Sequence, residues 1–293
     1  MSPLQVVGQV VTLRRAGAYH RIVLTAPGIA AQVRPGHFVA LAVGGAQTSM
    51  LLRRAFSVHR AGSRENGQGS GRGSDTVELV FAVHGRGTAW LAARRTGDAV
   101  DVVGPLGRPF ALPREPVSCV LVGGGYGSAP LFALAEGLRE RGCGVHMVLG
   151  AASQDRLFGV VEAKHLSETL DVTTDDGSTG RRGIVSDVLP DVIAATGGEV
   201  VYACGPMGML AAVARIAGQS GAASQCAVEE SMACGIGVCM TCVLPVVGDD
   251  GVTRMVRSCV EGPVFRGDRV RWDAVGTVPA DALGAPALEG GHR

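Results

Sequence analysis

The sequence has almost no excess of charge of either sign. Its 27 Lys and Arg residues nearly balance 26 Asp and Glu residues, which leaves a formal net charge of +1. A basic nucleic-acid surface or an acidic tail would produce a larger imbalance. We therefore expect no nucleic acid among the partners, and we favour small molecules and other proteins.

Long apolar runs and targeting signals are also missing. No apolar stretch approaches the roughly 20 residues that a membrane-spanning helix requires. The first residues, Met-Ser-Pro-Leu-Gln, do not resemble the basic segment and apolar run of a secretory signal. We expect a cytoplasmic protein that makes no use of a membrane.

The common catalytic motifs are absent as well. The sequence contains no Ser/His/Asp arrangement, no paired-carboxylate motif and no H-E-x-x-H metal motif. These motifs therefore give no candidate catalytic residue. No repeat of about 20 to 50 residues is visible either.

The sequence does contain eight cysteines, and four of them lie in one region. Cys234, Cys239 and Cys242 follow the spacing C-x4-C-x2-C, and Cys259 lies sixteen intervening residues further on. This is the ligand spacing of plant-type [2Fe–2S] clusters. Gly235 and Gly237 suit a loop that must turn tightly around a cluster. We predict that these four cysteines bind a [2Fe–2S] cluster.

Two other uses of these cysteines remain open at this point. A structural zinc site normally pairs two C-x2-C knuckles, and here only Cys239 and Cys242 form one. Disulfides are the second alternative, although a cytosolic protein keeps its thiols reduced. The other four cysteines, which we expect to be buried thiols, are Cys119, Cys143, Cys204 and Cys226.

Residues 1–113 consist of short β-rich runs separated by glycine and proline, which predicts an antiparallel β-barrel. The expected strands are Val6–Val11, Tyr19–Thr25, His37–Val43, Phe56–Val58, Val77–Val83 and Ala99–Val103. A polar, glycine-rich tract between Arg60 and Thr76 is interpreted as a flexible hairpin insertion. A short helix is expected at Ala89–Arg95.

Residues 114–222 alternate apolar strands with helices, which is typical of a parallel α/β sheet. The expected strands are Val117–Val122, Val145–Leu149, Leu170–Thr174 and Val200–Cys204, and the helices are Ala129–Arg141, Ile184–Ile193 and Met207–Ala217. Residues 223–273 form the cysteine module, with a hairpin of Val243–Val247 and Thr253–Arg257. Residues 274–293 are interpreted as a flexible tail.

Two turns at the strand ends of the α/β region are candidate nucleotide sites. Residues 123–130, Gly-Gly-Gly-Tyr-Gly-Ser-Ala-Pro, lie between a strand and a helix, where backbone amides can face a pyrophosphate. Residues 204–207, Cys-Gly-Pro-Met, end a later strand at the same edge. The acidic residue that usually binds the ribose is missing after the second strand, where Gly150-Ala151-Ala152-Ser153 stands.

The barrel region has two candidate anion-binding segments. Arg54 and Ser57 lie beside an expected strand, and residues 84–88, His-Gly-Arg-Gly-Thr, precede the short helix. A guanidinium matches phosphate oxygens, and exposed amides bind anions. Taken alone, each segment is more often a surface arginine or an ordinary turn than an anion site.

Together these motifs, in this order, resemble the ferredoxin–NADP reductase superfamily. The cysteine module directly after the nucleotide region resembles the electron-transfer subunits of class 1B dihydroorotate dehydrogenase. The resemblance implies FAD on the barrel, NAD on the α/β domain and the [2Fe–2S] cluster on the third module. The family usually has proline where Ala55 stands and often arginine where Ala82 stands.

By the same resemblance, individual residues receive expected roles. The residues expected to contact FAD are Arg54, Phe56, Ser57, Val80, Phe81, Ala82, Gly87 and Thr88. The residues expected at the nicotinamide nucleotide are Gly123, Gly124, Gly125, Gly127, Cys204, Gly205, Pro206 and Met207. The cluster ligands are the four cysteines already named.

The resemblance also implies a partner and a direction of electron flow. A separate FMN-containing catalytic subunit would oxidise dihydroorotate, in a heterotetramer with this chain, and electrons would pass through the cluster and FAD to NAD+. One alternative is a reductase subunit for a glutamate-synthase-like, hydrogenase or oxygenase partner. A non-enzymatic redox sensor is the other.

Overall fold

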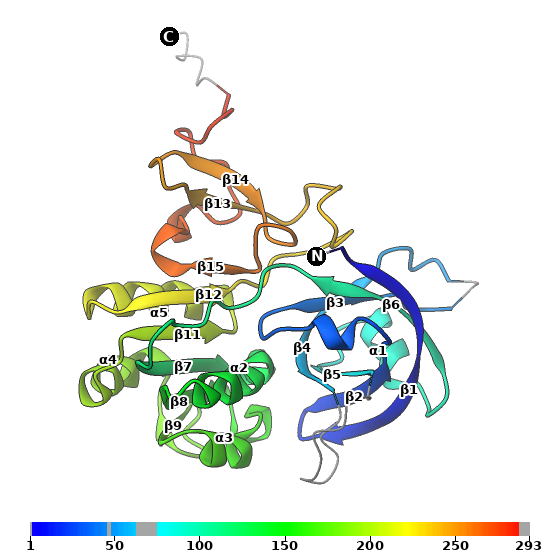
Figure 1. The fold of residues 1–293 in the computed structure, drawn as a ribbon, viewed down its shortest axis with the longest axis horizontal. Coiled ribbons are helices and arrows are strands. Elements are labelled where there is room, and N and C mark those ends of the chain that lie inside the picture. Colours follow the sequence, from blue (N-terminus) through cyan, green and yellow to red (C-terminus); the bar gives the residue numbers. More distant parts are fainter. Residues whose placement is uncertain (1, 46–47, 63–74, 287–293) are drawn as a thin grey trace.

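The computed structural model describes residues 2–45, 48–62 and 75–286. It contains a closed barrel, a seven-stranded sheet covered by helices, and a small hairpin module beyond the sheet (Figure 1). The expected fold class is confirmed. Most of the polar tract between Arg60 and Thr76 and the last residues of the expected tail lie outside the described residues.

Six strands close the barrel in the order β1-β2-β5-β4-β3-β6, with every pair antiparallel. Their bounds are β1 Leu4–Ala16, β2 Tyr19–Thr25, β3 Phe38–Leu41, β4 Arg54–Ala61, β5 Thr76–Phe81 and β6 Ala99–Leu106. Along the barrel strands, side chains that face the interior alternate with side chains that face outward. In β2, Ile22 and Leu24 are fully buried, whereas Val23 between them is partly exposed.

The short helix α1, Arg86–Ala92, begins earlier than expected. The side chain of Thr88 folds back on the preceding turn, where its hydroxyl accepts from the amide of Gly85 at 3.2 Å and donates to the carbonyl of Gly85 at 3.1 Å. This local capping satisfies amides at the helix start, so the helix begins at the turn itself.

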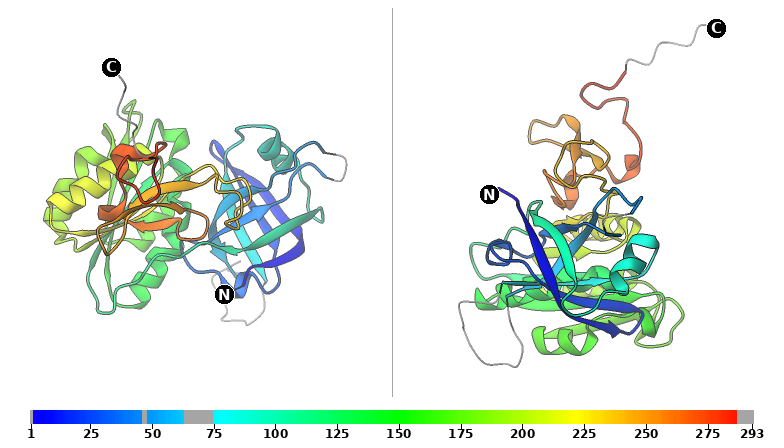
Figure 2. Two further views of the ribbon diagram at one scale, coloured as in Figure 1. Left: turned by 90° about the horizontal axis from the view of Figure 1, so that it is seen from above. Right: turned by 90° about the vertical axis from the view of Figure 1, so that its right-hand side faces the viewer.

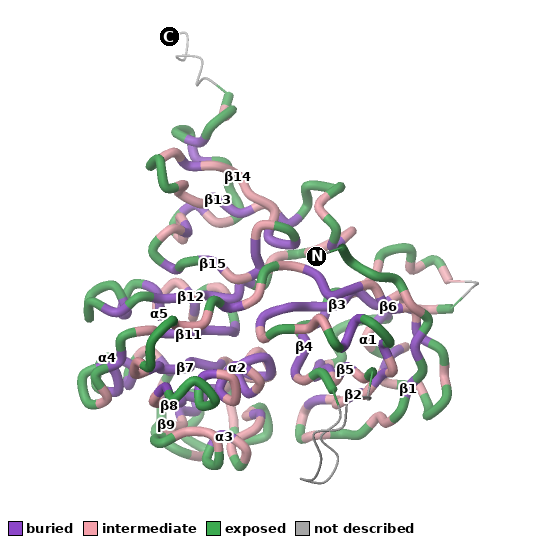
Figure 3. The backbone as a smooth tube through the Cα atoms, in the orientation of Figure 1, coloured by how far each residue is buried: buried purple, intermediate pink, exposed green. Residues whose placement is uncertain are grey.

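The sheet has the order β10-β9-β8-β7-β11-β12-β15, with β15 antiparallel at one edge. The strands are β7 Ser118–Gly124, β8 Gly144–Ala151, β9 Thr169–Thr174, β10 Arg181–Arg182, β11 Val200–Cys204, β12 Ala223–Ala227 and β15 Val264–Arg266. Helices α2, Ala129–Glu140, and α3, Val160–Leu166, cover one face, whereas α4, Val185–Thr196, and α5, Met207–Gln219, cover the other (Figure 1). Residues of the sheet and of the facing sides of its helices are buried (purple in Figure 3), and their apolar side chains form one core cluster on each face of the sheet.

The C-terminal region is woven into the sheet rather than attached to it. Strands β12 and β15 belong to the sheet, and between them the chain leaves to form the cysteine loop and the hairpin of β13, Val243–Val247, and β14, Thr253–Arg257. The right-hand view of Figure 2 shows this hairpin (orange) beyond the sheet edge. The described part of the tail returns to it, since Leu283 N donates to Thr253 O at 2.8 Å.

Barrel and sheet meet through buried contacts of β4. The ring of His59 is fully buried, and its Nδ1 donates to the carbonyl of Ala129 at 2.6 Å. The guanidinium of Arg60 pairs with Glu136 of α2 at 2.8 Å and with Glu162 of α3. These contacts hold β4 next to the turn after β7. Expected site residues lie on both of these segments. No helix of the described segments is both long and apolar enough to cross a bilayer.

Candidate functional site

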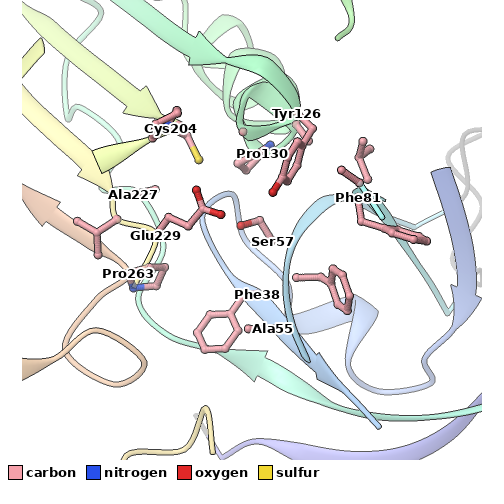
Figure 4. A pocket seen from close by; sticks show the side chains of 18 of the residues that line it. Phe38, Ala55, Ser57, Phe81, Tyr126, Pro130, Cys204, Ala227, Glu229 and Pro263 are labelled. Atoms are coloured by element: carbon pink, nitrogen blue, oxygen red, sulfur yellow. The ribbon is translucent and has the colours of Figure 1, made fainter. Parts of the chain in front are cut away.

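A cavity of about 330 Å³ lies between the barrel and the carboxyl edge of the sheet. Figure 4 shows it bounded by β4 and β5 on one side and by the turns after β7 and β11 on the other. It brings together most of the residues expected to bind cofactors: Arg54, Phe56, Ser57, Val80, Phe81, Ala82, Thr88, Gly124, Gly127, Cys204, Gly205 and Pro206. Residues about 150 positions apart in the sequence thus line one space.

The two neighbouring arginines at the start of β4 have different roles. Arg53 forms a two-pronged ion pair with Asp101, with both N–O distances 3.0 Å. Arg54 lines the cavity, and its Nη1 donates to the carbonyl of Leu52 at 2.7 Å. Gly87 is buried beside Arg54, since a Cβ at Gly87 would lie 2.9 Å from Arg54 Nε. Gly87 therefore leaves room for this guanidinium, which can offer its remaining N–H groups to phosphate oxygens.

Apolar side chains of β4 and β5 form the barrel wall. The rings of Phe56 and Phe81 meet edge to face with centroids 5.7 Å apart, and both are almost fully buried. Ser57 pairs with Phe38 across β3 and β4, and both residues face the cavity (Figure 4). Such a wall, with one hydroxyl and one guanidinium, fits a flat heteroaromatic ring that carries a phosphorylated tail.

The sheet side contributes groups that remain protonated. Burial raises the pKa of the Cys204 thiol to about 12, and the nearby Glu229 carboxylate adds to the rise. Burial likewise raises the pKa of Tyr126 to about 12, again with a contribution from Glu229. All three face the same space (Figure 4). The sequence analysis did not identify Glu229 or Tyr126 as site residues, because only the fold brings them to Cys204.

The glycines of the two turns allow the turns to pack on each other. A Cβ on Gly124 would lie 2.8 Å from Met209 Sδ, and one on Gly127 would lie 2.8 Å from Gly205 Cα. Gly123 is equally confined, against Ser128 at 2.5 Å, and does not line the cavity. Close packing and ligand access therefore both require small residues here.

A second cavity of about 430 Å³ continues along the carboxyl edge of the sheet. It shares Gly124, Tyr126 and Pro206 with the first cavity and adds Gly125. Its other lining residues come from the ends of β8 and β9 and from the starts of α4 and α5: Gly150, Ala151, Ala152, Thr173, Asp175, Ile184, Val185, Ser186, Gly208, Met209 and Ala212, with Tyr19 and Arg156. Met207 begins α5 beside both cavities but lines neither.

The cysteine loop presents two pairs of thiols. Cys234 and Cys239 lie within hydrogen-bonding reach of each other, and so do Cys242 and Cys259. Within the described residues, no three His, Cys, Asp or Glu side chains surround a point at which a single metal ion could bind. Two thiol pairs match the two irons of a [2Fe–2S] cluster, each of which takes two cysteine ligands.

Local backbone geometry explains how the loop can fit such a cluster. Gly235 and Gly237 have φ of +71° and +84°, and the amide of Ile236 between them donates to Cys234 Sγ at 3.5 Å. Hydrogen bonds from Thr241 lower the pKa of Cys239 to about 6, which favours the thiolate that binds iron. The assignment of the four cysteines as ligands stays a prediction that this geometry supports.

The remaining four cysteines behave as expected. Cys119, Cys143, Cys204 and Cys226 are all buried free thiols. Burial raises the pKa of Cys119 and of Cys226 to about 12. The thiols of Cys119 and Cys226 are therefore protonated at neutral pH and pack in the core.

Two family models match the chain. Residues 229–271 match the iron-sulfur cluster binding domain of dihydroorotate dehydrogenase B, and residues 121–215 match an oxidoreductase NAD-binding domain. These ranges contain the cysteine loop and both strand-end turns.

Curated relatives extend the similarity to most of the chain. The dihydroorotate dehydrogenase B (NAD+) electron transfer subunit of Geobacillus thermodenitrificans is 37% identical over 254 residues, which is 86% of this chain and 92% of the relative. The corresponding subunit of Bacillus caldolyticus is 39% identical and covers 81% of this chain and 86% of its own.

Solved structures agree with the fold. An NADH-dependent reduced ferredoxin–NADP oxidoreductase superposes with a TM-score of 0.78 at 30% identity over 92% of this chain and 91% of that one. The cytochrome b5 reductase domain of Ulva prolifera nitrate reductase gives a TM-score of 0.58 at 15% identity over 74% and 93%, so it shares the fold alone. With its relatives, its matching domains and its paired cysteines considered together, the chain belongs to the family of electron transfer subunits of NAD+-dependent dihydroorotate dehydrogenase B.

Proposed function

We propose that this chain carries electrons from an FMN-containing dihydroorotate dehydrogenase catalytic subunit, through a [2Fe–2S] cluster and FAD, to NAD+. One observation carries the proposal. Phe38 lines the cavity that fits the flavin, and it also belongs to the hydrophobic cluster that contains Cys242 and Cys259. The cluster ligands and the flavin site thus share a packed wall of the barrel.

When bound, the cluster supplies one-electron transfer, and FAD supplies the exchange between single electrons and a hydride. The protein's own residues bind, orient and exclude water. Arg54 provides charge-assisted hydrogen bonds for the FAD pyrophosphate, and Thr88 holds the turn beside it. Phe56, Val80, Phe81 and Ala82 form the apolar wall, and Ser57 offers a hydroxyl.

The sheet side receives the nicotinamide nucleotide. The turns that contain Gly123–Gly127 and Cys204–Met207 meet at the carboxyl edge, where open α/β sheets bind nucleotides. Cys204 and Tyr126 stay neutral at physiological pH because burial raises both pKa values. The Cys204 thiol and the Tyr126 phenol therefore add no charge of their own beside the bound nucleotide.

The cysteine loop also provides the contact surface for the catalytic subunit. Ile236, Val238 and Met240 are 52%, 76% and 51% exposed, and the thiol of Cys239 is exposed between them. Exposed apolar side chains gathered in one short loop are typical of a protein interface. We infer that the FMN-containing subunit covers this loop in a heterotetramer located in the cytoplasm.

Related reductases provide a second candidate function. The NADH-dependent reduced ferredoxin–NADP oxidoreductase is 30% identical and superposes over 92% of this chain, and its name refers to ferredoxin and NADP rather than to dihydroorotate. A reductase subunit for another redox complex would use the same two cavities with a different contact surface. The partner therefore distinguishes the two candidates.

Co-expression with candidate partners tests the proposal. The chain is expected to co-purify with an FMN-containing dihydroorotate dehydrogenase catalytic subunit, and the complex is expected to reduce NAD+ with dihydroorotate. The variant Val238→Asp places a charge on the exposed loop. It is expected to prevent co-purification while iron and FAD stay bound. Stable co-purification of the wild type only with a different oxidoreductase would assign the chain to the second candidate function.

A further inference from the structure

A guanidinium lies at the cysteine loop, at the point where the β13–β14 hairpin returns to it. Arg257 is the last residue of β14, and it pairs with Val243, the residue after Cys242. Its Nη1 donates to the carbonyl of Gly237 at 2.9 Å. Arg257 therefore connects the strand that leads to Cys259 with the loop that holds the first cysteines of the motif.

Gly237 is confined at this point of the loop. A Cβ on Gly237 would lie 2.5 Å from Val260 Cγ2 and 3.4 Å from Arg257 Nη1, and its φ is +84°. Burial raises the pKa of the Cys259 thiol, and a backbone hydrogen bond from Gly237 opposes that rise. The glycine that Arg257 anchors thus also donates to a predicted cluster ligand.

The positive charge of Arg257 acts on two of the thiols. The pKa of its guanidinium is raised, first by the hydrogen bond to Glu261, next by the charge of that carboxylate, and further by Cys259 and Cys242. The guanidinium is therefore close enough to both cysteines to interact with them electrostatically.

Glu261 holds the guanidinium in place and offsets part of its charge. Its carboxylate accepts from Nη2 and Nε of Arg257 at 2.7 and 3.3 Å, and from the Arg257 amide at 3.0 Å. The amide of Glu261 donates to the carbonyl of Arg257 at 2.8 Å, which closes the turn that contains Cys259. The ion pair is therefore fixed to the turn of the fourth cysteine.

We propose that the positive charge of Arg257 raises the reduction potential of the [2Fe–2S] cluster, and that Glu261 offsets part of this effect. The proposal rests on the proposed function, since it concerns the cluster that the four cysteines are predicted to bind. Reduction adds one negative charge to a group that four thiolates already make negative, and a nearby cation stabilises the added charge. Arg257 thereby favours the entry of electrons from the partner subunit.

Redox titration of the purified full chain with dithionite tests this, with the electron paramagnetic resonance signal of the reduced cluster as the readout. Arg257→Gln removes the charge and keeps an N–H donor for Gly237. It is expected to lower the ratio of reduced to oxidised cluster at a fixed potential by about tenfold. Glu261→Gln leaves the guanidinium without its counter-charge and is expected to raise that ratio.

The matched control is Arg254→Gln. Arg254 pairs with Asp250 at 2.7 Å, also four residues away, but lies three residues before Arg257 on β14 and next to the hairpin turn. This variant is expected to keep the wild-type potential. Added salt is expected to shrink the shifts of the Arg257 and Glu261 variants, because these side chains are 35% and 30% exposed and are screened. A change of loop structure alone would not respond to salt in this way.

The outcomes separate the inference from the proposed function. If Arg257→Gln keeps the wild-type potential, or if the Arg257 and Glu261 variants shift in the same direction, the inference is wrong and the proposed function stands. If Arg257→Gln loses its iron, Glu261→Gln decides, because it retains the guanidinium, and an unchanged or lowered potential would overturn the inference. If the wild type binds no iron–sulfur cluster, both proposals fail.

Discussion

The amide and the hydroxyl of Ser258 both donate hydrogen bonds to the carbonyl oxygen of Cys242, each at 2.8 Å. Ser258 is fully buried and directly precedes Cys259. This double hydrogen bond closes the sixteen-residue excursion through the β13–β14 hairpin and brings the third and fourth cysteines of the motif together. The hairpin therefore serves to position Cys259.

Ser258→Ala removes the hydroxyl bond and leaves the amide bond in place. We expect the loop to lose about 1 kcal/mol of stabilisation and to release iron faster to a chelator. Chelator-dependent bleaching of the cluster absorbance measures this. Ser231→Ala, at an exposed position of the same loop, is the control and should bleach at the wild-type rate. Equal rates in all three proteins would contradict the role given to Ser258.

Serine at any of the four motif cysteines should abolish assembly of the cluster, because a cysteine thiolate is the ligand that iron–sulfur clusters require. Iron and sulfide analysis of Cys234→Ser, Cys239→Ser, Cys242→Ser and Cys259→Ser measures the effect against two irons per wild-type chain. Cys226→Ser lies outside the spacing and should retain full iron content. Zinc in place of iron in the wild type would refute the cluster.

Arg54→Ala should lose FAD and keep its iron. The guanidinium is the proposed phosphate ligand of the barrel wall, and its removal should weaken FAD binding by about ten- to a hundredfold. Flavin content after gel filtration, together with iron analysis, separates the two effects. Arg95→Ala, beyond the far end of α1 and exposed, should retain FAD. Full flavin occupancy in Arg54→Ala would move the flavin away from β4.

Acid should destabilise the contact between barrel and sheet. Burial lowers the pKa of His59 to about 3 in the folded chain, compared with 6.5 for an unperturbed histidine. Between about pH 3 and pH 6.5, only the unfolded chain binds a proton at this histidine. The stability that comes from burying neutral His59 is therefore complete above about pH 6.5 and is lost as the pH falls toward 3. Burial also lowers the pKa of His37 to about 4, so this histidine makes stability depend on pH in the same direction.

Thermal unfolding midpoints between pH 7 and pH 5 measure this dependence. The fall in midpoint should be smaller in His59→Gln, which has no titrating group, than in the wild type. Exposed His84 provides the control, and His84→Gln should follow the wild-type curve. If His59→Gln falls as steeply as the wild type, His59 does not contribute to the acid sensitivity.

Local patterns in the sequence were sufficient for most of the architecture. Strand β2 and the β13–β14 hairpin occur at their expected bounds, because alternation and turn residues act over a few positions. Helix α3 was not predicted, and β12 and β15 were not expected in the sheet, because their short segments have no strong periodicity and are stabilised by neighbours distant in sequence.

The candidate site was likewise predictable only in part from local patterns in the sequence. The cysteine spacing and the two glycine-rich turns are local signals, and the fold gathers both turns around the cavities. Glu229 has no local signal. It becomes a candidate only because β11 and β12 bring it toward Cys204.

Dihydroorotate-dependent formation of NADH by the reconstituted complex tests the central claim most directly. NADH is expected only when this chain and the FMN-containing catalytic subunit are both present. With Cys242→Ser in place of the wild type, NADH formation should cease while the catalytic subunit still oxidises dihydroorotate with an artificial electron acceptor. NADH formation at an undiminished rate without this chain, or with the cluster-free variant, would contradict the account.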